Sequence, residues 1–233
     1  DKLAELLWAI EENIEAYNNL ILATDDLIKA KFVDMFYNDK TYKFKTVNLD
    51  KIALVTAGQT SPKEDDFTDE GVPFIKAGNL YDLINTKNFD EDQCLRVTED
   101  VVNKYKLKLQ NKGTIIFAKS GMSCMKGHVY TLKKDAYVVS HLACVYPSDS
   151  DYKSIFLEYF FKDLKVESLV GKNSYPTISI STIKKLDVST PPKELQEQFA
   201  KFVDLSRESI ENLKIARDNL QLVKKAMIKK YFG

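Results

Sequence analysis

The chain has 233 residues, 44% of them hydrophobic and 29% charged, which is enough to build one large or two small domains. It contains no run of about eighteen apolar residues, which excludes a membrane-spanning helix. The cysteines Cys94, Cys124 and Cys144 have no short spacing, and His128 and His141 are the only histidines, which argues against a zinc site. Unpaired thiols and the lack of a secretory leader predict a cytoplasmic protein, and no motif indicates a metal or cofactor.

The formal net charge is zero, but the charges are unevenly distributed. Residues 1–38 carry eight acids and three bases, whereas residues 194–233 carry six acids and eight bases. Residues 101–134 contain eight lysines and no acid. These are Lys104, Lys106, Lys108, Lys112, Lys119, Lys126, Lys133 and Lys134. Taken alone, this window is explained by a solvated surface; concentrated on one domain, it is a candidate phosphate-binding surface.

Residues 1–38 have the heptad pattern of a long coiled-coil helix. Apolar or seam-compatible residues alternate at spacings of four and three, and neither Gly nor Pro interrupts them. They are Leu3, Leu7, Ile10, Ile14, Tyr17, Ile21, Thr24 and Ile28. Such a stripe needs a partner in water, because an isolated helix of this kind cannot bury it.

Residues 191–233 supply the partner. Pro191-Pro192 ends the preceding segment, and a second, more irregular stripe follows at Leu195, Phe199, Phe202, Ile210, Leu213, Leu220, Val223 and Met227. The end of this segment, 222–233, also repeats the pattern of residues 27–38, as expected for two related helices. The opposite charges favour an antiparallel coiled coil; the alternative is that each helix packs on the central domain as a surface helix.

Residues 39–190 differ from both flanks and predict an α+β domain with a curved mixed or antiparallel sheet. Short β-rich runs separated by turn residues are expected as strands at 47–55, 73–77, 113–119, 127–132, 136–140 and 142–146. A helical stretch is expected over 152–169, and a loop leading into a strand over 171–180.

Known catalytic patterns are mostly absent from this domain. It has no phosphate-binding loop and no methyltransferase tetrapeptide. Asp151-Tyr-Lys153 and Asp163-Leu-Lys165 match half of a metal-nuclease pattern, but so short a pattern arises by chance. Cys124 with His128 or His141 is the one nucleophile pair to consider, against the simpler interpretation that both histidines are hydrogen-bonding groups on a binding surface.

Three polar and basic loops remain as candidate binding elements. The loop 119–128 follows a strand and presents two lysines, hydroxyl groups and a histidine between glycines that permit close backbone approach. A second strand ends near Lys76 and Asn79, whose side chains suit guanine and adenine in a major groove. The third loop is 171–176. Each alone is explained as a surface turn, but together with the lysine-rich window they favour a DNA-facing edge.

Several segments in a fixed order resemble a known family. Gly58-Gln-Thr60, Val72-Pro-Phe-Ile-Lys76, the run 113–121 and Tyr175-Pro-Thr-Ile-Ser-Ile-Ser181 look like the ordered motifs of a target-recognition domain. The run 191–199 looks like the Pro-Pro-x-x-x-Gln start of the helix that follows such a domain. Together they resemble the specificity subunits of type I restriction–modification systems, over the whole chain.

The resemblance implies a non-catalytic subunit in which recognition domains, set apart by an antiparallel helix pair, each read half of a split site in double-stranded DNA. It also implies that the helices recruit methyltransferase subunits and, through them, the restriction subunit. The expected parts are an N-terminal helix over 1–38, a recognition domain over 39–190 and a C-terminal helix over 191–233. With one recognition domain here, either another precedes Asp1 or the chain is a half-subunit that pairs, as in a homodimer.

By position, the resemblance implies DNA contacts from the recognition loops. The expected contact residues are Gln59, Thr60, Lys76, Asn79, Lys119, Ser120, Met122, Ser123, Lys126, His128, Lys172, Asn173, Ser174 and Tyr175. Two other functions stay open. The chain could be an interaction scaffold or decoy that occupies methyltransferase docking sites without binding DNA, or a nuclease that uses Asp151 or Asp163.

Overall fold

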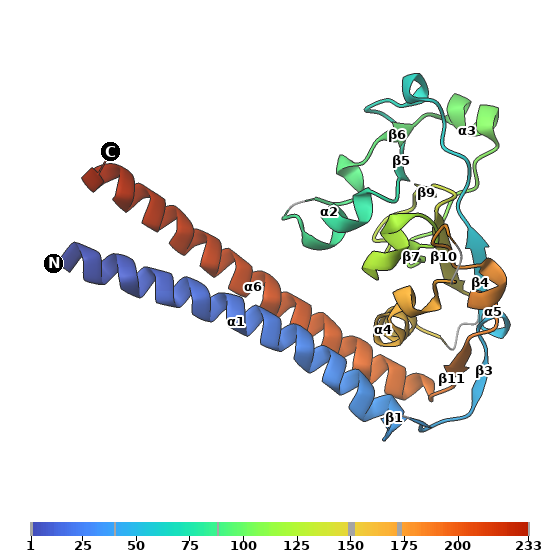
Figure 1. Ribbon diagram of the computed structural model, residues 1–233, viewed down its shortest axis with the longest axis horizontal. Coiled ribbons are helices and arrows are strands. Elements are labelled where there is room, and N and C mark those ends of the chain that lie inside the picture. Colours follow the sequence, from blue (N-terminus) through green and yellow to red (C-terminus); the bar gives the residue numbers. More distant parts are fainter. Residues whose placement is uncertain (1, 40, 88, 149–151, 172–173, 233) are drawn as a thin grey trace. The chain divides into compact units, whose positions relative to one another are not determined.

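A computed structural model describes residues 2–39, 41–87, 89–148, 152–171 and 174–232 (Figure 1). The chain divides into two compact units. The first combines Asp1–Thr41 with Glu197–Gly233, and the second is Tyr42–Gln196. The predicted fold class is confirmed: a mixed helix-and-sheet chain carries a long helix at each end, and these two helices pack together.

The first unit is an antiparallel helix pair made by α1 (Lys2–Phe36) and α6 (Lys193–Phe232). Figure 1 shows the start of α1 beside the end of α6. The cross-helix contacts agree with that direction, because the partner number falls as the α1 number rises. Lys224 pairs with Glu11, Arg217 donates to the Asn18 side chain at 3.2 Å, and Phe199 lies 5.4 Å from Phe32 between ring centroids.

The seam predicted for α1 is confirmed residue by residue. All eight predicted positions are buried or half-buried, and between residues 2 and 27 the other positions are exposed except Asp25. The stripe continues through Phe32 and Phe36, which pack with Phe199 in an aromatic cluster. Burial of this cluster stabilises the pair, since each large aromatic side chain buries on the order of 150–250 Å².

The stripe expected for α6 is corrected at one position, because Val223 is exposed and the other seven expected residues are buried or half-buried. The buried and half-buried residues of the helix include a regular series at spacings of four and three: Phe199, Val203, Ser206, Ile210, Leu213, Arg217, Leu220, Lys224 and Met227. Polar residues occupy three of these positions, which hid the period from an interpretation based on apolar residues. Val223, expected in the seam, is 48% exposed, because Lys224 takes the seam position instead.

The second unit holds the sheets and the shorter helices. Its helices are α2 (Asn79–Asn85), α3 (Glu99–Tyr105), α4 (Ser154–Leu164) and α5 (Ile180–Lys184). Its strands are β3 (Thr46–Asn48), β4 (Ala53–Ala57), β5 (Val72–Ile75), β6 (Arg96–Val97), β7 (Ile115–Ala118), β8 (Val129–Thr131), β9 (Tyr137–Val138), β10 (Leu142–Pro147) and β11 (Asp187–Ser189). A short ribbon, β1 (Tyr37–Asn38) with β2 (Thr41–Tyr42), follows α1.

The main sheet is antiparallel with the strand order β4-β10-β7-β8. Val145 in its second strand lies opposite Val55 on one side and Ile115 on the other. A smaller sheet, β6-β5-β9, is mixed, because β5 pairs antiparallel with β6 and parallel with β9. Strand β11 returns to pair with β3. The expected combination of mixed and antiparallel pairing is therefore present, divided among small sheets.

Helix α4 packs on β7 and β8 and closes the core of this unit. Its Phe161 lies 4.9 Å from Phe117 of β7 between ring centroids, and both are fully buried. The buried face of the main sheet therefore holds β7 and β8 firmly, and the loop that connects these two strands begins and ends on a rigid base.

Two expected strands differ in the structure. The run 47–55 is divided by a 3₁₀ turn, Leu49–Lys51, so that β3 and β4 join different sheets. The strand expected to end near residue 180 is replaced by the start of α5, because the Ser179 hydroxyl accepts from the Thr182 N–H at 2.9 Å and caps the helix. An isolated bridge joins Thr177 to Ser120.

Candidate nucleic-acid interface

Two glycines with positive φ angles bound the turn in the loop between β7 and β8. Gly121 (φ 75°) and Gly127 (φ 64°) have left-handed backbone conformations, which disfavour residues with a Cβ. Between them lies a 3₁₀ helix, Met122–Lys126, anchored by the buried Cys124. Met122, Met125 and Lys126 are exposed as a result. We call residues 119–128 the β7–β8 loop.

The β7–β8 loop is joined to the segment 174–178. The Gly121 N–H donates to the Pro176 carbonyl at 3.0 Å, and the Ile178 N–H donates to the Lys119 carbonyl at 2.7 Å. Ser174 and Tyr175 are exposed beside this connection. The structure therefore brings the first and third predicted loops together. Lys172 and Asn173 lie outside the described residues.

Side chains from two other elements reach the same loop. His141 Nδ1 lies 2.8 Å from the Ser120 hydroxyl, and the Tyr81 ring of α2 lies 5.9 Å from the His128 ring. Partial burial, with a smaller contribution from the Lys126 charge, lowers the pKa of His128 from its ordinary value. His128 is therefore held toward its neutral form, in which it can both donate and accept a hydrogen bond.

Tyr81, Met125 and His141 were not among the predicted contact residues. The sequence does contain a signal for Tyr81. Leu80 and Leu83 have helical spacing and mark the buried face of α2, so Tyr81 falls on the exposed face. His141 gave no such signal, because its neighbour Ser120 is 21 residues away in the chain.

Lys76 and Asn79 form a self-contained turn at the start of α2. The Asn79 side-chain oxygen accepts from the Lys76 N–H at 2.8 Å, and the Asn79 N–H donates to the Lys76 carbonyl at 3.0 Å. The Lys76 ammonium lies 4.4 Å from the centre of the Phe67 ring, a cation–π contact. Helix α2 also packs on β8, so this turn belongs to the same region as the β7–β8 loop.

The Gln59 side chain is half-buried and bonds to the backbone of its own domain. Its side-chain N–H donates to the Lys106 carbonyl at 3.0 Å, and its side-chain oxygen accepts from the Lys108 N–H. Its backbone bonds to Val138 and Ser140. The geometry gives Gln59 the role of fixing the segment 106–108, whereas the neighbouring Thr60 is exposed.

The lysine-rich window is less basic than its composition indicates. Lys104 pairs with Asp66 at 2.8 Å, and Lys134 pairs with Asp92. The pKa of both carboxyl groups is lowered as a result. The largest cause is the hydrogen bond from Lys104 to Asp66 in one pair and from Lys134 to Asp92 in the other. The Glu167 carboxylate also lies against Gly127, since a Cβ there would meet it at 2.2 Å.

The structure gives little support to a function that requires a cysteine nucleophile or a bound metal ion. Cys124 is 1% exposed, and burial raises the pKa of its thiol, which disfavours the nucleophilic thiolate. Among the residues that the structure describes, no cluster of three His, Cys, Asp or Glu side chains could hold a metal ion. Asp151 lies outside the described residues.

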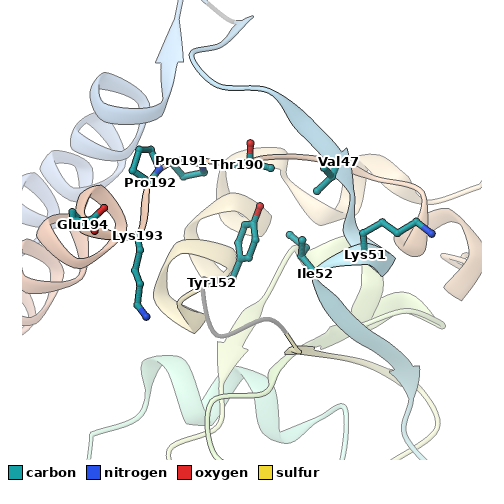
Figure 2. A pocket seen from close by; sticks show the side chains of 9 residues that line it. All are labelled: Val47, Lys51, Ile52, Tyr152, Thr190, Pro191, Pro192, Lys193 and Glu194. Carbon is teal, nitrogen blue, oxygen red and sulfur yellow. The ribbon is translucent and has the colours of Figure 1, made fainter.

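A pocket of about 560 Å³ lies elsewhere in the second unit, where the chain enters α6. Figure 2 shows Tyr152 between Pro191-Pro192 on one side and Val47 and Ile52 on the other, with the ammonium groups of the two lining lysines directed away from the ring. None of the predicted contact residues lines it.

The Pro-Pro-x-x-x-Gln segment has a structural explanation next to this pocket. Gln196 is 1% exposed, and its side chain donates to the Pro191 carbonyl at 3.0 Å and accepts from the Lys153 N–H at 3.1 Å. It therefore ties the first turn of α6 to the residue that precedes α4.

No helix in the described part of the chain is long and apolar enough to span a membrane.

Comparisons with known proteins agree with this architecture. The family model of the type I restriction modification DNA specificity domain matches residues 41–219. The specificity subunit of the type I restriction enzyme MjaIX from Methanocaldococcus jannaschii is 27% identical over 209 residues, which are 85% of this chain and 46% of that protein. The chain thus spans about half the length of this curated relative.

Solved structures share the fold at low sequence identity. The HsdS subunit from Thermoanaerobacter tengcongensis matches 99% of this chain and 56% of its own, with a TM-score of 0.64 and 17% identity. The type I restriction-modification S subunit from M. genitalium matches 100% of this chain and 60% of its own, with a TM-score of 0.66 and 17% identity. With a family model that covers most of its length, the chain belongs to the type I restriction modification DNA specificity domain family.

Proposed function

We propose that this chain reads one half of a split DNA site as the recognition part of a type I specificity subunit. The observation that carries the proposal is the β7–β8 loop, a basic and polar loop held outward between two left-handed glycines. The segment that carries the exposed Ser174 and Tyr175 is hydrogen-bonded to this loop, and the Tyr81 ring lies beside its His128.

The contacts divide into two kinds by their chemistry. Lys119 and Lys126 would bind phosphate groups, which contribute affinity but little sequence information. Ser120, Ser123 and His128, with Ser174 and Tyr175, would read base edges, and Met122 would contact them through its apolar side chain. Lys172 and Asn173 are also proposed to contact DNA, on the basis of the family resemblance alone.

The two turns outside the loop have narrower proposed roles. Thr60 is exposed and would contact DNA directly, and Lys76 would add positive charge. Gln59 and Asn79 would act by holding backbone in place, since both side chains already bond to it.

The helix pair would dock methyltransferase subunits and, through them, the restriction subunit. Exposed apolar side chains on both helices support this proposal: Trp8 is 74% exposed, and Leu22 and Leu222 are similarly uncovered. A partner with a second recognition domain, such as another copy of this chain, would complete the split site. Mass measurement of the chain alone and with a methyltransferase subunit tests both associations.

The DNA-binding proposal is tested by removing the two loop cations. The variant Lys119→Ala/Lys126→Ala should bind every duplex on the order of tenfold or more weakly at low salt. The slope of log affinity against log salt should also fall by about two, because two phosphate groups are no longer neutralised by lysine.

Lys134→Ala is the matched control, because that lysine belongs to the same window but pairs with Asp92. Its salt slope should stay close to that of the unchanged chain. Normal duplex binding by the loop double variant would show that the assigned surface is wrong. Binding of a methyltransferase subunit without any DNA affinity would select the scaffold function instead.

A further inference from the structure

Two methionines extend from the β7–β8 loop into solvent. Met122 is 73% exposed and Met125 is 51% exposed, in a loop whose other exposed groups are polar or charged. Removing an exposed thioether side chain from water is favourable, so contact with an apolar partner would stabilise both methionines.

The backbone places the two side chains on one side of the loop. Residues 122–126 form a 3₁₀ helix, in which side chains three positions apart are aligned. Met122 and Met125 have this spacing, while Cys124 between them is buried and anchors the turn. The left-handed glycines at both ends fix the turn relative to β7 and β8.

The surroundings select the kind of partner. Lys119 and Lys126 flank the methionines in the sequence, and Lys126 is exposed beside them, which favours a partner that combines negative charge with an apolar group. Ser120 and His128 add hydrogen-bonding groups that suit base edges. In the DNA major groove, the apolar group on a base edge is the 5-methyl group of thymine.

We propose that Met122 and Met125 form an apolar contact with thymine 5-methyl groups in the target site, so that this pair determines specificity for thymine at one or two positions. This inference rests on the proposed function, because it assigns a base preference to the same loop. A long, unbranched thioether can adjust to a methyl group without strain.

The test removes the methyl group without changing base pairing. The chain of 233 residues first selects its preferred duplex from a random-sequence library, and each thymidine is then replaced in turn by deoxyuridine. Affinity should fall about fourfold at each contacted position, the effect of exposing roughly one buried methyl group. In the variant Met122→Gln/Met125→Gln, the same replacement should change affinity less than about twofold.

A matched control keeps the comparison specific. Leu95 is an exposed apolar residue of the same domain, and Leu95→Gln should retain the full deoxyuridine effect. Circular dichroism of all variants establishes that they are folded; because both methionines are exposed, no loss of fold is expected.

Each outcome decides the proposal. If the unchanged chain selects a sequence but is indifferent to deoxyuridine, or if the methionine variant keeps the full effect, the thymine contact is wrong and the DNA-binding function stands. If the variant keeps the effect but no longer binds a methyltransferase subunit, the methionines serve a protein interface instead. If the unchanged chain selects no sequence, both proposals fail.

Discussion

The Gly58-Gln59 segment and the β7–β8 loop both follow a strand of the main sheet, and both carry polar side chains, but the domain uses them in opposite ways. At Gly58 the chain lies against another backbone: a Cβ there would meet the Val139 carbonyl oxygen at 2.2 Å. The adjacent Gln59 amide bonds to the segment 106–108. In the β7–β8 loop, by contrast, the polar and thioether side chains of Met122, Met125 and Lys126 point outward.

The difference separates the residues that build the second unit from those available to a ligand. A polar side chain whose groups are already bonded to backbone would leave those groups unpaired if it turned toward DNA. An exposed side chain on a fixed turn carries no such cost. Substitutions should therefore change stability at the first segment and DNA binding at the second.

The largest effect is expected for Gly58→Ala. The new methyl group would overlap the carbonyl oxygens of Val138 and Val139, so backbone rather than side chain has to move. The free energy of unfolding should fall by about 3 kcal/mol or more. Urea denaturation followed by circular dichroism measures it.

Gly78→Ala is the matched control, because within the described part of the chain no atom beyond its immediate neighbours lies within 4 Å of the position that its Cβ would take. Its unfolding free energy should change by less than about 0.5 kcal/mol. Equal losses in the two variants would contradict the close backbone approach at Gly58.

A smaller effect is expected for Gln59→Ala. The Lys106 carbonyl and the Lys108 N–H would lose their bonds to the amide, at a cost of about 1–2 kcal/mol in unfolding free energy. Ser123→Ala in the β7–β8 loop should leave stability unchanged, within about 0.5 kcal/mol. A Gln59→Ala variant with full stability and an altered base preference would instead make Gln59 a reader of DNA.

The sequence predicted the features that depend on local periodicity. The α1 seam followed from residues three and four apart, and the strand pair around the β7–β8 loop followed from short β-rich runs between glycines. Arg217 and Lys224 were missed in the α6 seam because a polar residue gives no signal of burial there. The hydrogen bonds of Gln59 were missed because its partners lie 47 and 49 residues away.

The smallest predicted effect concerns His128 and its protonation. Burial first, and then the Lys126 charge, lowers the pKa of His128 below its ordinary value of 6.5. As the pH falls through 6.5, the unfolded chain takes up a proton that the folded chain resists, so stability decreases until the pH passes below the folded pKa. His128→Gln removes this dependence, and Lys126→Ala should weaken it.

The check is the difference in urea midpoint between the unchanged chain and His128→Gln, measured at about pH 5.5 and about pH 7.5, on either side of the ordinary histidine pKa. Other groups contribute equally to both proteins and cancel in that difference. The unchanged chain should lose more stability than the variant on acidification. Phosphate groups at Lys119 and Lys126 would favour the charged imidazole, so a bound duplex should reduce or reverse the difference. If the two proteins respond alike to pH without DNA, His128 is not desolvated at the base of this loop. The His128 side chain would then be as accessible to solvent as that of Met122.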